Sequence, residues 1–239
     1  IKSMCKTSTK VFILEVMGRH AGWIAAAGEL ANNAKQTFVH KILLPEVSFD
    51  EDKFLNGVEK DVGDHGYSVI VASEGLKNKN GELYASSTET DSFGHNQLGG
   101  LAPKIASLIT EKLSLKNHWS VADYLQRSAR HVSSQTDIEQ AVAVGKAAVK
   151  LAAEGKTGVM PIIKRISDSP YEWSISEGDL NEIANEEKTL PKHFISSDGF
   201  RITKAGRDYL QPLIEGESFP KFSNGIPIYE GLDLHLRKI

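Results

Sequence analysis

The sequence predicts an α/β fold in which a parallel sheet is flanked by helices. Three apolar runs, at 11–16, 38–44 and 67–72, have the length and the content of branched and large apolar residues that buried strands need. The segments between them, 23–34 and 50–63, have the composition or the spacing of helices. Because strands and helices alternate, right-handed crossovers and a parallel sheet are expected.

The first strand and the helix after it form the clearest pair. Residues 11–16 are large and apolar except for Glu15, and the stretch 23–34 is rich in alanine, which strongly favours a helix. The short segment 17–22 between them contains two glycines and is predicted to be a turn.

The second and third strands each stop at a polar residue. The run at 38–44 is followed by Pro45 and Glu46, and the run at 67–72 is followed closely by Glu74. The helix predicted between these strands has one apolar face, formed by Phe54, Leu55 and Val58.

After the third strand, the predicted strands and helices no longer alternate regularly. Residues 77–94 are polar and rich in glycine, serine and threonine, which is typical of an exposed loop. A helix at 137–154 is expected to be capped by Thr136, with Glu139 completing a capping box. The remaining predicted elements are helices at 98–113, 179–187 and 203–214, an extended segment at 118–123, and strands at 158–166 and 171–175.

Composition excludes several classes of protein. The 239 residues carry 28 basic and 31 acidic side chains, so no broad basic surface for nucleic acid is expected. No apolar run approaches the ~20 residues that span a bilayer, so no membrane association is expected. Cys5 is the only cysteine, which excludes an intrachain disulfide and suits the cytoplasm. The histidines show no ligand-like pairing, and no metal site is expected among these residues.

The N-terminal residues suggest a longer protein. They lack both an initiator methionine and the apolar core of a signal peptide, and the first predicted strand follows almost at once. We therefore expect this chain to be part of a longer polypeptide.

Polar residues at the carboxyl ends of the three strands mark the expected ligand site. Gly18 lets backbone approach a ligand, the following helix start offers N–H groups, and Arg19 suits a phosphate. Glu74 is placed to accept hydrogen bonds from sugar hydroxyls. On the residues alone, a purely structural turn at Gly18 and a solvated Glu74 remain open alternatives. The acidic cluster from Glu46 to Asp52 is interpreted as a solvated helix start.

An ordered set of motifs resembles the phosphofructokinase family. Residues 15–22 contain Met-Gly-Arg after a strand, and the segments 44–46, 71–75 and 124–127 follow in the family's order and at suitable spacing. The resemblance covers 10–151. It implies two Rossmann-like lobes with the active site between them, and transfer of a phosphoryl group to the 1-hydroxyl of fructose 6-phosphate.

The resemblance also implies roles for individual residues. Arg19 would stabilise the transferring phosphoryl group, Glu74 would bind sugar hydroxyls, and Tyr124 and Arg127 would hold the 6-phosphate. Lys10 falls where relatives place a cation that reaches a neighbouring subunit's site; Lys116 and His118 match such a position poorly. The full set of substrate-binding residues implied is Met17, Gly18, Arg19, Glu74, Tyr124, Leu125, Gln126, Arg127 and Lys10.

Departures from the family pattern indicate the phosphoryl donor. Many ATP-dependent relatives have histidine where this chain has Tyr124, and two glycines where it has Ser128 and Ala129. The tyrosine is more usual in the pyrophosphate-dependent branch, so pyrophosphate is favoured over ATP. The family's glycine-rich loop and its Thr-Ile-Asp segment do not occur in the chain. The catalytic aspartate and most ligands of Mg²⁺ are therefore expected in an N-terminal half outside it.

These implications divide the chain into three parts. Residues 1–131 would form the sugar-phosphate lobe, 132–190 would complete the donor lobe, and 191–239 would wrap back or pack at an interface. A homo-oligomer, dimer or tetramer, is expected. The alternative is a non-catalytic truncated paralogue or regulatory subunit that binds a sugar phosphate.

Overall fold

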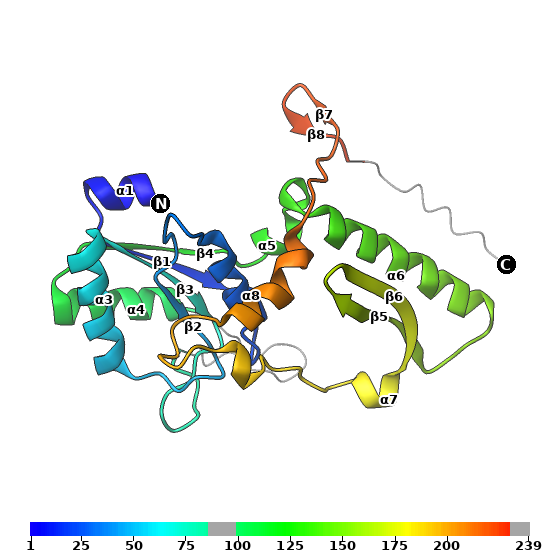
Figure 1. Cartoon of the computed structure of the whole chain (residues 1–239), viewed down its shortest axis with the longest axis horizontal. Coiled ribbons are helices and arrows are strands. Elements are labelled where there is room, and N and C mark those ends of the chain that lie inside the picture. The colour runs from blue at the N-terminus through cyan, green and yellow to red at the C-terminus, as the bar shows by residue number, and fades with distance from the viewer. Residues whose placement is uncertain (86–98, 230–239) are drawn as a thin grey trace.

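A computed structural model describes residues 1–85 and 99–229 of the chain. Its centre is a four-stranded sheet in the order β2-β3-β1-β4, with every neighbouring pair parallel (Figure 1). The strands are β1 (Val11–Val16), β2 (Lys41–Leu43), β3 (Ser68–Ser73) and β4 (Asn117–Val121). The predicted α/β fold with a helix-flanked parallel sheet is confirmed.

The register of β1 brings the ends of three strands together. Val16 lies opposite Ser73 of β3, and Glu15 lies opposite Val121 of β4. The amide of Glu74 donates to the carbonyl of Val16 at 3.0 Å. The segments that follow β1, β3 and β4 therefore start side by side at one edge of the sheet.

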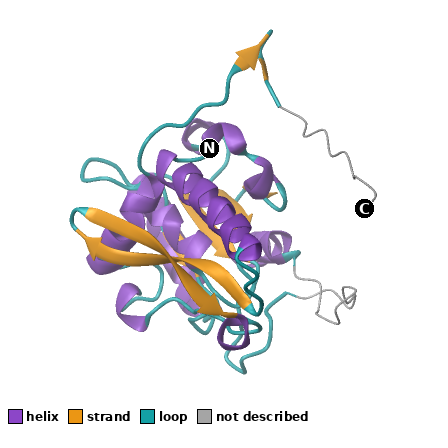
Figure 2. Ribbon diagram, turned by 90° about the vertical axis from the view of Figure 1, so that its right-hand side faces the viewer, coloured by secondary structure: helices purple, strands orange, loops and turns teal. Residues whose placement is uncertain are grey.

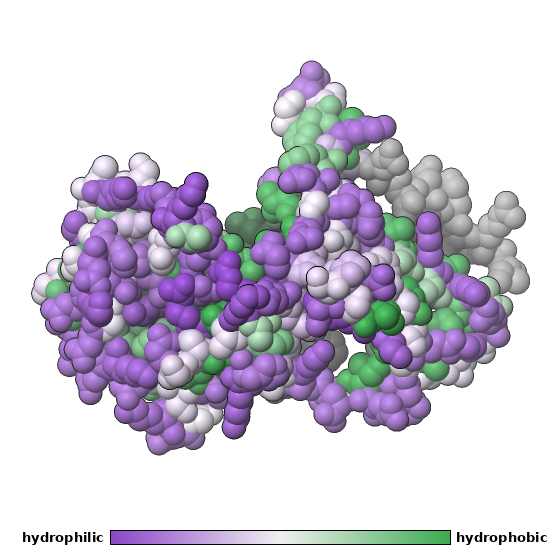
Figure 3. Space-filling model, in the orientation of Figure 1, coloured by the Kyte–Doolittle hydropathy of each residue, from purple (hydrophilic) through white to green (hydrophobic). Residues whose placement is uncertain are grey.

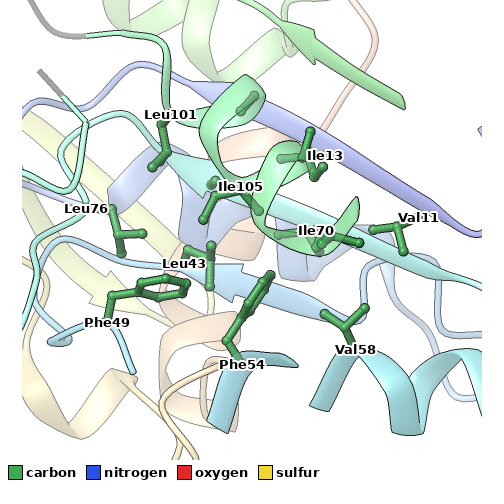
Figure 4. Close-up of a cluster of buried hydrophobic side chains, with 14 of the residues drawn as sticks. Val11, Ile13, Leu43, Phe49, Phe54, Val58, Ile70, Leu76, Leu101 and Ile105 are labelled. Carbon is green, nitrogen blue, oxygen red and sulfur yellow. The ribbon is translucent and has the colours of Figure 1, made fainter. Parts of the chain in front are cut away.

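The strands present apolar side chains on both faces of the sheet, and helices therefore cover both faces. On one face, α3 (Glu51–His65) and α4 (Leu101–Leu113) enclose a buried cluster that includes Ile13, Ile70 and Phe54 (Figure 4). On the other face, α2 (Trp23–Ala27) and the 3₁₀ turn η1 (Gly28–Ala31) cover a cluster around Val71.

A helix and a hairpin form a separate layer beyond the sheet. Helix α6 (Gln135–Ala153) lies across β5 (Val159–Asp168) and β6 (Tyr171–Asp179), which pair antiparallel (Figure 2). Gln140 of α6 donates to the hydroxyl of Tyr171 at 2.7 Å. Apolar residues gather over this layer, whereas the surface over the sheet is mainly polar (Figure 3).

After the hairpin the chain returns to the sheet. Helix α8 (Lys204–Leu210) packs against α2 and η1, and Phe194 and Leu210 join the cluster around Val71. The short elements of the chain are α1 (Lys2–Thr7), α5 (Leu125–Ser128), η2 (Arg130–Val132), α7 (Leu180–Ile183), η3 (Lys192–Phe194), η4 (Gln211–Ile214), β7 (Phe222–Ser223) and β8 (Ile226–Pro227).

An ion pair with a buried carboxylate fastens this returning segment. The Glu29 side chain is 3% exposed and accepts from Arg201, with Nε to Oε2 at 2.7 Å and Nη2 to Oε1 at 2.5 Å. Arg207 of α8 adds hydrogen bonds to the carbonyl oxygens of Glu29 and Asn32. The chain past residue 200 is thus tied to the segment that follows α2.

Several predicted elements differ in extent from those observed. The strand predicted at 38–44 is reduced to β2, because the Asn32 side chain takes the amides of Phe38 and Val39 that a strand would need. The α-helix predicted at 23–34 ends at Ala27 and continues only as η1.

The predicted cap of α6 is wrong. Ser134, not Thr136, is the N-cap, and its hydroxyl accepts from the amide of Asp137. The predicted loop at 77–94 lies outside the described residues from 86 onward. The division into parts at 131 and 190 stays a prediction.

Candidate functional site

A cleft of about 1500 Å³ opens at the carboxyl ends of β1, β3 and β4. Its walls come from three regions: the turn after β1, the segment after β4, and the returning chain at 187–188 and 213–219. The sequence-predicted residues that line it are Met17, Gly18, Arg19, Glu74, Tyr124, Gln126 and Arg127. The structure thus brings together seven predicted residues from three separate segments of the chain.

The turn after β1 is held by Glu74. Its Oε1 accepts from the amides of Gly18 at 3.1 Å and Arg19 at 3.0 Å. Arg19 has a φ of 47°, a conformation that L-residues adopt rarely and that needs support. A Cβ at Gly75 would lie 1.5 Å from the Arg19 carbonyl oxygen, so only glycine fits there. The end of β3 therefore fixes the backbone that carries Arg19.

A second carboxylate holds the end of the same turn. Oε1 of Glu46 accepts from the amide of Gly22 at 2.9 Å and from that of Leu190 at 2.7 Å. The sequence predicts Glu46 in a solvated helix start. That interpretation is wrong for Glu46, because its carboxylate binds two backbone amides.

These two carboxylates correct one expectation about anion binding. The turn was expected to offer backbone N–H groups to a phosphate, but Glu74 and Glu46 take the amides of Gly18, Arg19 and Gly22. These three amides are therefore not offered to an anionic ligand. Glu74 keeps one carboxylate oxygen, Oε2, for which the described residues supply no hydrogen bond.

The wall after β4 presents an aromatic ring and a guanidinium. Tyr124 precedes α5 and is 67% exposed, and the Arg127 guanidinium lies 5.5 Å from the centre of its ring. Gln126 lines the cleft with both polar side-chain atoms buried and, among the described residues, without a hydrogen-bond partner. Buried unpaired polar atoms are uncommon, so these atoms are available to a ligand or to another part of the protein.

Two predicted residues lie away from the cleft. Leu125 is 72% exposed and does not line it. Lys10 lies at the opposite end of β1, where its amide donates to the Lys116 carbonyl, and His118 nearby bonds Thr9. Lys10 therefore takes no part in this chain's own cleft, and a role in a neighbouring subunit's site stays a prediction.

Glu15 is among the cleft residues that the sequence analysis did not assign to the site. Glu15 is 1% exposed; its Oε2 accepts from the amide of Ala102 at 2.7 Å, and its Oε1 is buried without a partner among the described residues. Burial raises the pKa of Glu15, and the nearby charges of Glu74 and Asp123 raise it further. A lone carboxylate inside an otherwise apolar strand was the available signal.

Replacing Glu15 by glutamine is expected to change the pH dependence of stability. Because burial raises the folded-state pKa above the ordinary value of 4.5, the folded protein holds this proton to higher pH than the unfolded chain. The wild type therefore loses stability as pH rises from 4.5 through the raised pKa. Glutamine keeps the acceptor for Ala102 and does not ionise, so the variant should not show this loss.

Urea unfolding of both proteins between pH 4 and 8 checks the Glu15 prediction. The difference in unfolding free energy should move in favour of Glu15→Gln as pH rises and then level off. A difference that is constant across this range, or that moves toward the wild type, contradicts a buried carboxyl with a raised pKa.

The family profile described as phosphofructokinase matches residues 1–152, more than half of the chain. The chain therefore belongs to the phosphofructokinase family. The match includes every cleft residue from Glu15 to Arg127, but not the returning segment at 187–219.

Individual relatives carry a more specific name. The pyrophosphate–fructose 6-phosphate 1-phosphotransferase of Methylococcus capsulatus is 55% identical over 229 residues, which are 96% of this chain and 54% of the relative. The protein of the same name from Halomonas elongata is 54% identical, over 98% of this chain and 56% of its own length.

A solved structure agrees with the fold. The crystal structure of pyrophosphate-dependent phosphofructokinase from Marinobacter aquaeolei matches with a TM-score of 0.82 and 51% identity, over 99% of this chain and 57% of that one. The chain thus spans a little more than half the length of the relatives it matches.

Proposed function

We propose that this chain forms the fructose 6-phosphate site of a pyrophosphate-dependent phosphofructokinase. The enzyme would transfer a phosphoryl group from pyrophosphate to the 1-hydroxyl of the sugar phosphate. The observation that carries the proposal is the cleft, in which Arg19, Glu74, Tyr124 and Arg127 meet. The names of the Methylococcus and Halomonas relatives support the reaction and the donor.

The chemistry of the cleft fits a sugar phosphate. Arg127 supplies charge and hydrogen-bond donors for the 6-phosphate, and the exposed Tyr124 hydroxyl adds a neutral donor beside it. Oε2 of Glu74 is placed to accept from a sugar hydroxyl while Oε1 holds the Arg19 turn. Arg19 then meets the phosphoryl group at the other end of the sugar, where charge develops during transfer.

The described residues do not account for the metal ion or for the catalytic base of the proposed reaction. Residues 1–85 and 99–229 contain no cluster of three histidine, cysteine or acidic side chains that could hold a metal ion. We propose that the catalytic aspartate and most ligands of Mg²⁺ belong to the half of the enzyme that this chain does not span. We also propose a cytoplasmic enzyme that acts as a homo-oligomer, in which Lys10 reaches a neighbouring cleft. In the part of the chain described, no helix is both long and apolar enough to cross a membrane.

Calorimetric titration with fructose 6-phosphate tests the acceptor site. Fructose, inorganic phosphate and pyrophosphate are run separately as controls. Selective binding of the sugar phosphate by this chain supports the assignment, whereas equal binding of fructose and fructose 6-phosphate contradicts it. If the isolated chain is folded but does not bind, the titration is repeated on the protein at its full natural length. Lack of binding there overturns the proposal.

Turnover with pyrophosphate separates the enzyme from a non-catalytic paralogue. The protein at full natural length should form fructose 1,6-bisphosphate from pyrophosphate and much less from ATP. A protein that binds the sugar phosphate without turnover with either donor is the regulatory module instead.

A further inference from the structure

Among the described residues that line the cleft, carboxylates outnumber lysines and arginines. The carboxylates that line it are those of Glu15, Glu74, Asp123, Asp137, Glu187 and Glu217. The lysines and arginines that line it, within the described residues, are Arg19, Arg127 and Lys188. The amides of Gly18, Arg19 and Gly22 are already bonded to carboxylates, so these three side chains are the cationic groups that the described residues offer to a doubly phosphorylated ligand.

Lys188 belongs to a short segment, 187–190, that is fastened beside the Arg19 turn. Its carbonyl accepts from Nε1 of Trp23 at 2.7 Å, and Leu190 donates to the same Glu46 oxygen that holds Gly22. Glu187 approaches His20, with Oε1 3.9 Å from Nε2. The segment therefore cannot shift far without disturbing the start of α2.

The side chain of Lys188 is also oriented by its surroundings. Its ammonium lies 5.9 Å from the centre of the Trp23 ring, a favourable cation–π distance. Within the described residues, no carboxylate lies within ion-pair distance of it, in contrast to Lys156 and Lys204, which have such partners. The ammonium of Lys188 thus has no carboxylate partner among the described residues, and its backbone is held in place. Both properties are expected of a side chain that binds an anion.

We propose that Lys188 binds the phosphoryl group at the 1-position end of the ligand, remote from the 6-phosphate at Arg127. The reason is position: Lys188 is fastened next to the turn that carries Arg19, whereas Arg127 lies on the wall after β4. This assignment rests on the proposed function. It adds a substrate residue from outside the region that the family profile matches.

The inference is tested with Lys188→Gln in the protein at its full natural length. Binding of fructose 6-phosphate and of fructose 1,6-bisphosphate is measured by calorimetry. The variant should bind the bisphosphate about 10-fold more weakly, since one charge-assisted contact is lost, and the monophosphate within roughly 2-fold of wild type. In turnover, KM for pyrophosphate should rise while KM for fructose 6-phosphate changes little.

Two control variants make the result specific. Lys188→Arg keeps the charge and should restore most of the bisphosphate affinity. Lys192→Gln removes an exposed lysine of the same returning segment that does not line the cleft, and should bind both ligands as the wild type does.

The outcomes separate this inference from the proposed function. A wild type that binds neither ligand refutes the proposed function itself. A wild type that binds both, with Lys188→Gln unchanged, overturns only the role of Lys188. Equal weakening of both ligands places Lys188 at the 6-phosphate and overturns the assignment to the 1-position.

Discussion

Replacing Arg201 by methionine is expected to lower the free energy of unfolding by about 3 kcal/mol. The substitution removes both charge-assisted hydrogen bonds to Glu29, whose side chain is 3% exposed. Among the described residues, Arg207, 3.5 Å away, would then be the one charged partner left to the buried carboxylate. Removing one member of a buried ion pair is costly because the other remains desolvated. Urea unfolding at pH 7 measures the loss.

An exposed pair on the same segment provides the matched control. Lys204 and Asp208 pair across one turn of α8 with side chains 86% and 58% exposed, so Lys204→Gln should cost less than about 1 kcal/mol. Adding Glu29→Gln to Arg201→Met should recover part of the lost stability, since no buried charge is then left unpaired. If Arg201→Met costs no more than Lys204→Gln, the buried pair does not hold the returning segment.

The largest expected effect on ligand binding comes from Arg127. Arg127→Ala should weaken fructose 6-phosphate binding by about 1.5–3 kcal/mol, because a charged donor to the 6-phosphate is lost. That is roughly a 10- to 150-fold increase in Kd, which calorimetry resolves readily. The folded state should change little, because the Arg127 side chain is exposed and its main contact is with Tyr124.

Tyr124→Phe gives the graded comparison for Arg127→Ala. It removes one neutral hydroxyl and keeps the ring under the guanidinium, so the expected loss is only about 0.5–1.5 kcal/mol. Arg127→Lys should fall between wild type and Arg127→Ala, since the charge stays but the planar fork is lost. An unchanged affinity in Arg127→Ala removes this residue from the phosphate site, and a loss in Tyr124→Phe that exceeds it reverses their proposed roles.

The central strands were predictable because a strand that is buried on both faces of the sheet has a continuous run of apolar residues. The strand predicted at 11–16 coincides with β1, and that at 67–72 differs from β3 by one residue at each end. Where a side chain competes for the backbone, prediction was wrong: Asn32 shortens β2, and Ser134 displaces Thr136 as the cap of α6. Such competition depends on contacts across turns and loops that composition does not reveal.

The cleft shows the same division. Residues that follow strands, such as Arg19 and Glu74, were predictable because parallel strands deliver their carboxyl ends to one edge. The hydrogen bonds that hold the segments of the cleft in place were not predictable in the same way. That Glu46 bonds Gly22 and Leu190 at once depends on a chain reversal through α6 and the hairpin, which has no local signature.

The ion pair of Glu29 and Arg201 joins residues 172 positions apart, and the cleft wall extends to Phe219. During translation, the strands of the sheet leave the ribosome well before the segments that close the cleft beside them. At ~5–20 residues per second, the stretch from Arg127 to Phe219 takes roughly 5–20 s to synthesise. For that interval the nascent chain presents α2 and its apolar neighbours uncovered, so this window is when chaperones would be most needed.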